Sequence, residues 1–264
     1  MVDFLITDFL IEFTNEGRYE VFKSIFKTKK RHSEIEKELD LPGPEISRNI
    51  KRLLKKELIK KQVSGEYEMT STGIIVHEIL KMLEKILGLT DFLNNHDITA
   101  IPINLMLQMG KLDSINIEDQ TMVNIQKWAD LVKSAEEFII SISDQFQDSI
   151  LPIIEKKISN QTIDIKAIVD ASLLKDSIKV GKIFKDRHEV YNKMDAFQNV
   201  KVLEKVNLSL LGTEKGAIIF LSSKDKVDYS LCLHDDSESF IEWTKDLFHW
   251  YWKNGKDLKS FIKS

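Results

Sequence analysis

The 264-residue sequence has a single cysteine, Cys232, and only four prolines and ten glycines. One cysteine excludes an intramolecular disulfide framework and a zinc site built from several thiolates, and it favours a reducing compartment. The scarcity of proline and glycine excludes collagen-like and Pro/Gly-rich disordered chains. With 42% hydrophobic and 30% charged residues, the composition is that of a globular protein. The length fits one large domain or two unequal ones.

Long apolar runs and a basic N-terminus are also lacking. Residues 1–13 are apolar but carry three acidic residues and no basic one, so they lack the positive start of a signal peptide. No apolar stretch approaches the ~20 residues that a membrane-spanning helix needs. The sequence therefore predicts a cytoplasmic protein with no membrane partner.

Charge is unevenly distributed along the chain. Residues 23–62 contain 13 Lys and Arg against six Asp and Glu, a balance of +7, whereas the rest of the chain has a balance of −11. A basic segment inside an acidic chain is typical of a nucleic-acid-binding module. On charge alone, a solvated helical face is an equally good interpretation.

Hydrophobic periodicity favours the first interpretation. It predicts a helix over 16–26, a short helix capped by Ser33, a break at 41–44, a helix from Pro44 to about Glu57, and a hairpin over 58–69. Helix, helix, tight turn, basic helix and hairpin is the order of a winged helix-turn-helix.

The basic helix has one apolar face for docking on its own domain and one polar face for DNA. Arg48 and Arg52 are candidates for bidentate contacts with guanine, because a planar guanidinium matches its O6 and N7 atoms. Lysines of the helix and hairpin are candidates for phosphate contacts. The alternative is a winged helix used only for protein contacts. The predicted DNA-binding residues are Pro44, Ser47, Arg48, Asn49, Lys51, Arg52, Lys55, Lys60, Lys61 and Ser64.

Two segments are candidates for homodimer contacts. In a helix through about Leu87, Ile75, Ile79, Met82 and Ile86 follow the 4-3-4 spacing of a short coiled-coil seam. A second amphipathic stripe runs from Phe4 to Phe13. Either segment could equally pack on its own core, but a winged helix that binds a two-fold DNA site generally needs a partner subunit.

From about Leu89 the pattern changes to alternating helices and strands. The predicted helices are 120–136, 149–160, 190–197 and 237 to about 259, and the predicted strands are 138–142, 163–169, 200–203, 208–211, 217–221 and 229–233. This order predicts an α/β domain with a mixed sheet. There is no Gly-rich phosphate loop, no G-x-S-x-G and no H-E-x-x-H. His96-Asp97 and His234-Asp235-Asp236 are more typical of turns and caps than of metal sites. We therefore predict no enzyme activity, metal or cofactor.

The residues also resemble a known family, the archaeal winged-helix transcriptional regulators of methanogens named for a regulator of filament formation and methanogenesis. The N-terminal resemblance is generic. The C-terminal one is more specific and lies in His96–Pro102, in Leu208-Ser209-Leu210, and in Trp243–Phe248 with Tyr251. It implies a DNA-binding regulator whose second domain senses a small metabolite. That domain is similar in its order of elements to the TrmB-like effector domain of archaeal sugar-responsive regulators. The similarity implies a phospholipase-D-like fold without the catalytic motif, and the lack of an H-x-K pair agrees with it.

The sequence thus predicts a two-domain α+β protein: a winged helix-turn-helix over 1–70, a linker and dimerisation helix over 71–94, and a mixed-sheet effector domain over 95–264. The predicted function is that of a homodimeric transcriptional regulator of double-stranded DNA, controlled by a small-molecule effector whose binding residues the sequence does not assign. The alternatives are a protein-binding scaffold and an enzyme with an appended DNA-binding domain.

Overall fold

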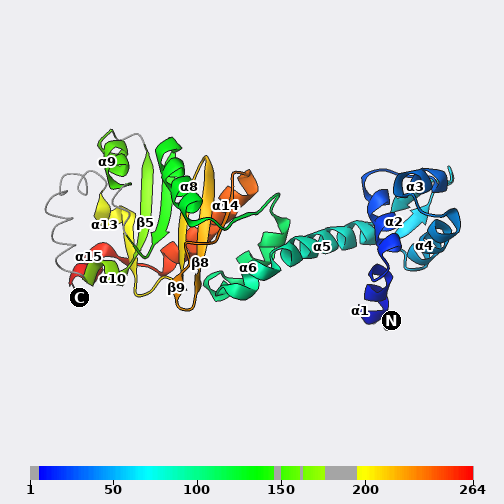
Figure 1. Cartoon of the computed structure of the whole chain (residues 1–264), viewed down its shortest axis with the longest axis horizontal. Coiled ribbons are helices and arrows are strands. Elements are labelled where there is room, and N and C mark those ends of the chain that lie inside the picture. Colours follow the sequence, from blue (N-terminus) through cyan, green and yellow to red (C-terminus); the bar gives the residue numbers. More distant parts are fainter. Residues whose placement is uncertain (1–5, 146–149, 161–162, 176–194, 264) are drawn as a thin grey trace. The chain divides into compact units, whose positions relative to one another are not determined.

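The structure is a computed structural model (Figure 1) that describes residues 6–145, 150–160, 163–175 and 195–263. The chain divides into two compact units, residues 1–85 and 86–264, each with its own hydrophobic core. A helical region with a hairpin is followed by a mixed sheet, which confirms the predicted fold class. Among the described residues, no helix is long and apolar enough to cross a membrane.

The smaller unit has the predicted helix-turn-helix and wing. Its core holds Val21, Phe22 and Ile25 of α2, Ile35 of α3, and the apolar face of α4. Helix α3 begins at His32, so the predicted Ser33 cap is wrong. The backbone N–H of Arg31 donates to the Glu34 carboxylate at 2.6 Å instead. The elements are α1 Ile6–Leu10, η1 Ile11–Phe13, α2 Glu16–Lys27, α3 His32–Leu39, α4 Gly43–Lys55, β1 Ile59–Lys61, β2 Tyr67–Met69 and α5 Ser71–Gly88.

The wing has a third row that the sequence did not reveal. Strands β1 and β2 pair antiparallel, with Lys60 opposite Glu68. On the other side of β2, Lys30 and Tyr67 exchange two backbone hydrogen bonds of 3.0 and 2.8 Å. The turn between the strands contains Gly65 at φ +86°, a conformation that favours glycine. The basic connector between α2 and α3 is therefore part of the wing.

Helix α5 begins at Ser71, two residues after β2 ends, and its first turn approaches the backbone between α4 and β1. A Cβ atom on Gly73 would lie 2.0 Å from the carbonyl oxygen of Leu58, so only glycine fits at this position. Val76 and Leu80 then pack on the core of the smaller unit, while Ile86 packs on the core of the larger one.

The larger unit is built on a sheet with the strand order β11-β6-β5-β4-β7-β8-β10-β3, and β9 pairs with β8. Strands β4, β5 and β6 are parallel neighbours, and the other pairings are antiparallel. The strands are β3 Asn116–Glu118, β4 Phe138–Ser143, β5 Asp164–Asp170, β6 Val200–Leu203, β7 Leu208–Thr213, β8 Gly216–Ser223, β9 Lys226–Val227, β10 Cys232–Asp235 and β11 Lys256–Asp257.

Helices cover both faces of this sheet (Figure 1). Ile139 packs with α8 and α9 on one face, whereas Ile140 and Ile142 pack with α14 on the other. These isoleucines belong to β4, so burial on both sides explains the continuous apolar run of that strand, as predicted. The helical elements are α6 Thr90–Asn95, η2 Ile98–Ala100, α7 Ile103–Gln108, η3 Met109–Lys111, α8 Thr121–Ser134, α9 Leu151–Ser159, α10 Ala171–Lys175, α13 Ala196–Asn199, α14 Glu238–Asn254 and α15 Leu258–Lys263.

Several predicted bounds in this unit are wrong. The C-terminal helix ends at Asn254 because Gly255 is extended, and β11 and α15 follow it. The last predicted strand begins at Cys232, since the side chain of Asp228 accepts hydrogen bonds from Ser230 in a turn. Strand β3 was not predicted. Of the predicted helix 190–197, residues 190–194 lie outside the described residues.

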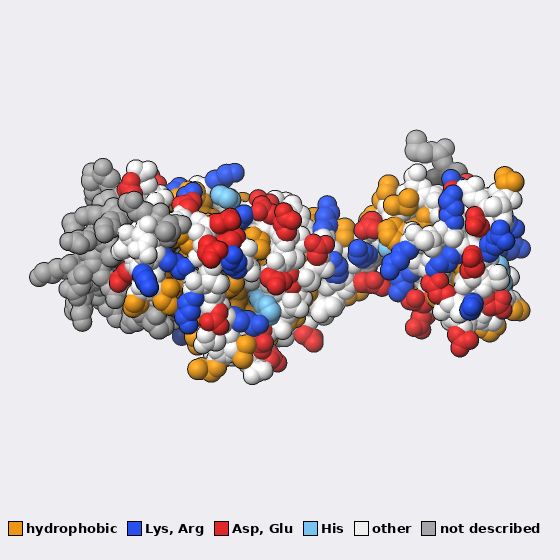
Figure 2. Space-filling model, turned by 90° about the horizontal axis from the view of Figure 1, so that it is seen from above, with side chains coloured by type: hydrophobic (Ala, Val, Ile, Leu, Met, Phe, Trp, Pro, Cys, Tyr) orange, Lys and Arg blue, Asp and Glu red, His pale blue; other side chains and the backbone are white. Residues whose placement is uncertain are grey.

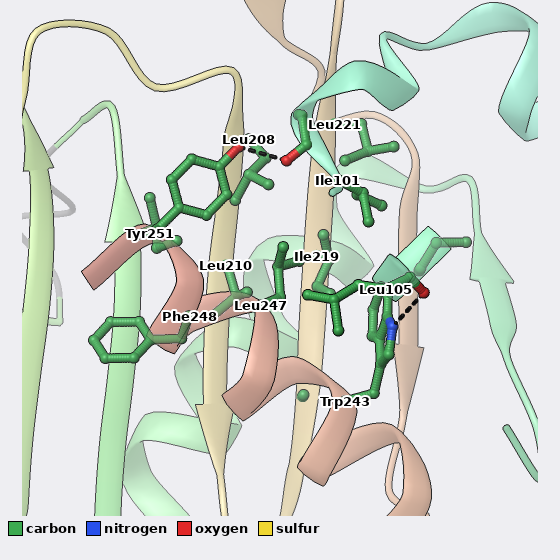
Figure 3. Close-up of a cluster of buried hydrophobic side chains, with 14 of the residues drawn as sticks. Ile101, Leu105, Leu208, Leu210, Ile219, Leu221, Trp243, Leu247, Phe248 and Tyr251 are labelled. Carbon is green, nitrogen blue, oxygen red and sulfur yellow. Dashed lines mark hydrogen bonds between the residues drawn. The ribbon is translucent and has the colours of Figure 1, made fainter. Parts of the chain in front are cut away.

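Two buried hydrogen bonds attach α14 to the segment that precedes the sheet (Figure 3). The Trp243 indole donates to the carbonyl oxygen of Leu105 at 2.9 Å, and the Tyr251 hydroxyl donates to that of Ala100 at 2.5 Å. Burial raises the pKa of Tyr251 well above its ordinary value. Both aromatic rings therefore fill the core and satisfy a backbone carbonyl at the same time.

Replacing Tyr251 by phenylalanine is expected to lower the free energy of unfolding by about 1 kcal/mol, because the ring stays in place while the Ala100 carbonyl loses its donor. Chemical denaturation followed by tryptophan fluorescence measures this, since all four tryptophans (128, 243, 250 and 252) belong to the larger unit. An unchanged midpoint would show that the hydrogen bond contributes nothing.

Candidate nucleic-acid interface

Helix α4 presents an apolar face to its own domain and a polar face to solvent. Ile46, Ile50 and Leu53 are almost fully buried in the core of the smaller unit. The opposite face is exposed, as the sequence predicts for a helix that meets DNA. The exposed residues of the predicted site on this helix are Pro44, Ser47, Arg48, Lys51, Arg52 and Lys55.

Exposure alone does not show which cations are available. In Figure 2, Lys and Arg side chains of the smaller unit are interspersed with acidic ones. Arg48, Lys51 and Lys55 form no ion pair with any residue that the structure describes. They occupy successive turns of α4, so their charges face solvent together. Such a row of uncompensated cations is what binding to a phosphate backbone requires.

A histidine holds the exposed hydroxyl at the start of α4. The Nε2 atom of His32 lies 2.8 Å from Oγ of Ser47 and 3.2 Å from the carbonyl oxygen of Gly43. Since His32 is the first residue of α3, this contact bridges the turn between the two helices. Ser47 is therefore oriented by its own domain before any partner binds.

Arg52 is already engaged within the protein. Its Nε and Nη2 atoms donate to the two carboxylate oxygens of Glu12 at 2.8 and 2.9 Å, a bidentate pair. Only 4% of the Glu12 side chain is exposed. Buried Arg18 also contacts Glu12. Its Nε atom lies 2.6 Å from the backbone carbonyl oxygen of Glu12 and 3.3 Å from the Oε2 atom of the Glu12 carboxylate. The planar fork proposed to bind guanine is thus occupied, whereas the guanidinium of Arg48 has no acidic partner among the described residues.

These contacts perturb the ionisation of the buried groups. The hydrogen bond from Arg52 lowers the pKa of Glu12 below its ordinary value, and burial lowers the pKa of Arg18. Beside them lies a cleft of about 380 Å³ between the N-terminal segment and the end of α4. Its lining residues are Asp8, Ile11, Glu12, Arg52, Lys55 and Lys56.

The structure corrects the placement of Asn49. Only 5% of this residue is exposed, so its amide does not reach the polar face of α4. It lies against the start of α2, where a Cβ atom on Gly17 would be 3.6 Å from its Nδ2. Close approach of the two helices, permitted by glycine, buries a position that a helical wheel alone places near the edge of the exposed face.

On the wing, one carboxylate holds two lysines. Lys60 and Lys29 lie 2.9 and 2.7 Å from the two oxygens of Glu68. Hydrogen bonds from Lys29 and then Lys60 lower the pKa of Glu68 to about 2. Lys61 and Ser64, also predicted as contacts, are exposed. The Lys61 ammonium lies 5.6 Å from the ring centre of Tyr67, and the Ser64 hydroxyl donates to Glu66 at 2.9 Å.

Sequence reasoning missed Glu12, Glu68 and Lys29 as parts of this surface. Glu12 is 40 residues from Arg52, and no local pattern connects the two. Glu68 was missed because a two-residue Ser64-Gly65 turn would place it opposite Lys61, whereas the observed three-residue loop 63–65 places it opposite Lys60. Lys29 was missed because its position beside Glu68 depends on the pairing of Lys30 with Tyr67, which was not predicted.

Helix α5 exposes an apolar stripe. Ile75 and Ile79 are 62% and 56% exposed, Met82 is half-buried, and Ile86 packs on the larger unit's core. Leu83 and Leu87, which were not predicted, are also exposed. The exposed residues therefore recur every four positions and depart from the predicted 4-3-4 spacing at Met82 and Ile86.

The N-terminal stripe packs mainly on its own domain. The Phe13 ring lies 5.3 Å from those of Phe9 and Phe22, edge to face, within the core of the smaller unit. Ile6, Leu10 and Ile11 remain exposed. Residues 4 and 5 of the predicted stripe lie outside the described residues. The structure thus favours the alternative in which this segment covers its own core.

In the larger unit, the His/Asp pairs take part in local structure. The Asp97 carboxylate accepts the backbone N–H of Thr99 at 3.0 Å, and Asp235 accepts that of Ser237 at 2.8 Å. The buried His96 ring stacks on Phe92 and lies 3.6 Å from Asp228. Within the described ranges, no group of three or more His, Cys, Asp or Glu side chains could hold a metal ion.

Comparison with known families gives one match. Residues 124–254 match the family model described as "Methanogenesis regulatory protein FilR1, middle domain". The matched region begins in α8 and ends with α14, so it contains the parallel strands and the central hairpin of the sheet. This confirms the family resemblance, with Leu208–Leu210 and Trp243–Tyr251 inside the matched region and His96–Pro102 before it. No curated protein matches the chain.

Three of the solved structures that resemble the chain illustrate how distant the similarity is. The archaeal chromatin protein TrmBL2, whose structure "shows a novel mode of DNA binding", has a TM-score of 0.40 at 14% identity, with 92% of this chain and 94% of that chain covered. NucT from Helicobacter pylori has a TM-score of 0.35 at 14% identity, covering 55% and 98%. The phospholipase D family member Nuc from Salmonella typhimurium has a TM-score of 0.33 at 12% identity, covering 55% and 97%.

Proposed function

We propose, from the premise that residues 124–254 of this chain belong to the FilR1 middle-domain family of methanogenesis regulatory proteins, that the protein is a DNA-binding transcriptional regulator. In this proposal the smaller unit binds double-stranded DNA and the larger unit senses a small-molecule effector. The protein acts in the cytoplasm and is not an enzyme.

The observation that supports this proposal most directly is the uncompensated row of cations on α4. Arg48, Lys51 and Lys55 face solvent from a helix whose other face is fixed in the domain core. In a winged helix, such a helix enters the major groove, with lysines on phosphates and an arginine on a base edge. Pro44, Ser47, Lys61 and Ser64 extend the proposed interface along the same helix and onto the wing.

The test is a binding selection of the purified full-length protein against random duplexes and duplexes from upstream of its own gene, at two salt concentrations. We expect recovery of a two-fold-symmetric site with an affinity that falls steeply as salt rises, because several phosphates are neutralised. A contact made mainly by apolar groups would not show that salt dependence. Binding at neither salt, with or without added metabolite extract, would overturn the proposal in favour of the protein-scaffold alternative.

We further propose that the protein is a homodimer and that α5 supplies the contact. Ile75, Ile79 and Leu83 form an exposed apolar stripe on an 18-residue helix, and two-fold DNA sites require paired winged helices. The occupant proposed for this stripe is therefore the same helix of a second copy.

Replacing Ile79 by glutamate is expected to weaken the dimer at least about tenfold. Each copy loses one buried isoleucine, worth roughly 1.5–3 kcal/mol, and places a charge at the seam. Sedimentation equilibrium measures the change. The matched control is Ile103→Glu, which alters another exposed isoleucine, 67% accessible, on α7. Equal effects of the two variants, or a wild-type monomer at all concentrations, would exclude α5 as the contact.

A further inference from the structure

We infer that the outer face of the wing is a second phosphate-binding surface, whose affinity for phosphate is reduced by the carboxylate of Glu68. The surface, called here the wing row, consists of Lys29, Glu68 and Lys60. This inference rests on the proposed DNA-binding function and adds to it a contact with the DNA backbone that does not depend on base sequence.

The register of the three-row wing places these side chains in one line. Lys60 is directly opposite Glu68 in the hairpin. On the other side of β2, the pairing of Lys30 with Tyr67 brings Lys29 opposite Glu68. Neighbouring residues of a strand point to opposite faces. Buried Ile59 and Met69 mark the inner face, so the wing row lies on the outer one.

The two lysines have the exposure that a phosphate contact needs. Their side chains are 56% and 57% exposed, whereas that of Glu68 is only 17% exposed. Each ammonium group meets a different oxygen of the carboxylate, at 2.7 and 2.9 Å, and Gln62 also donates to it. Both oxygens are thus used inside the protein, and two exposed cations are paired with one less exposed anion.

A phosphate must compete with Glu68 for these lysines. If either lysine turns to DNA, it leaves a half-buried carboxylate with fewer partners, so the net gain from the contact is small. In the described part of the chain, no carboxylate pairs with Arg48, Lys51 or Lys55 of α4. The protein therefore obtains its electrostatic affinity mainly from α4, and the wing row restrains binding to DNA of any sequence.

Glu68→Gln removes the competing charge and keeps the size of the side chain. On a random-sequence duplex, we expect affinity to rise about two- to tenfold, the size of one or two exposed ion pairs. We also expect the slope of log affinity against log salt to steepen by up to about 1.8, for two added phosphate contacts. Glu66→Gln is the matched control, because it removes the same charge from the same hairpin, where Glu66 accepts a hydrogen bond from Ser64.

A second variant identifies the lysines. Lys29→Gln and Lys60→Gln, added together to Glu68→Gln, should return both affinity and slope to the wild-type values. Circular dichroism verifies that every variant is folded. Equal behaviour of Glu68→Gln and Glu66→Gln, or a gain that survives loss of both lysines, would overturn the inference while the wild type still binds DNA. If the wild type binds no duplex at any salt, the proposed function itself fails.

Discussion

Replacing Glu12 by glutamine is expected to lower the free energy of unfolding of the smaller unit by about 3 kcal/mol. Breaking a buried ion pair from one side leaves the other charge buried and uncompensated. That charge belongs to Arg18, which is 6% exposed, while the freed guanidinium of Arg52 can turn to solvent. Hydrogen exchange measured by mass spectrometry over residues 6–85 reports on this unit separately.

Asp8→Asn is the matched control for this prediction. It removes the same charge from the lining of the same cleft, but Asp8 is exposed. We expect a change within about 0.5 kcal/mol, as for other surface substitutions. If the two variants destabilise the unit equally, the carboxylate of Glu12 does not hold the N-terminal segment.

The same carboxylate makes stability depend on pH. The folded state lowers the pKa of Glu12 below its ordinary value of 4.5, chiefly through the hydrogen bond from Arg52. A depressed pKa means that the stabilisation is complete above pH 4.5 and is lost as the pH falls through the folded pKa. The difference in stability between wild type and Glu12→Gln is therefore expected to narrow below pH 4.5, and a constant difference would contradict this linkage.

The ion pair between Glu12 and Arg52 is an example of a contact that the sequence could not predict. The order and approximate bounds of α2, α3, α4 and the hairpin followed from apolar spacing and from Pro42 and Pro44, because those signals are local. Partners across the fold were not predictable in this way. Arg52 bears the same charge as Arg48 on the same helix, and only the packing of residues 11–12 against α4 distinguishes them.

In the larger unit, the continuous apolar run Phe138–Ile142 predicted strand β4, which is covered on both faces. In β5 and β6 the apolar residues are interrupted by Asp164, Lys166 and Lys201. Strand β3 was missed because it is a three-residue edge strand with a single apolar residue, Ile117. The end of α14 was misplaced because Gly255, which is extended here, is also tolerated within a helix at a cost of about 1 kcal/mol. No sequence signal assigned binding residues for the proposed effector.

Replacing Arg48 by alanine is expected to cost about 1–3 kcal/mol of discrimination at one base pair in each half-site. The reason is geometric: Arg48 is the arginine of α4 whose guanidinium meets no acidic partner in the described part of the chain. Affinity for a wild-type site and for its single-base variants, measured at one salt concentration, gives this cost directly. Lys55→Ala should instead weaken binding to every duplex alike and reduce the salt slope by about 1.

Arg52→Ala separates the two roles that an arginine can have on this helix. Because its guanidinium is held by Glu12, its loss should destabilise the N-terminal segment and leave the base preference unchanged. The opposite result, with base preference lost in Arg52→Ala and kept in Arg48→Ala, would mean that DNA displaces Glu12 and that α4 meets the groove with its other edge. The protein would then trade an internal ion pair for a base contact, and Glu12→Gln would bind DNA more tightly than the wild type.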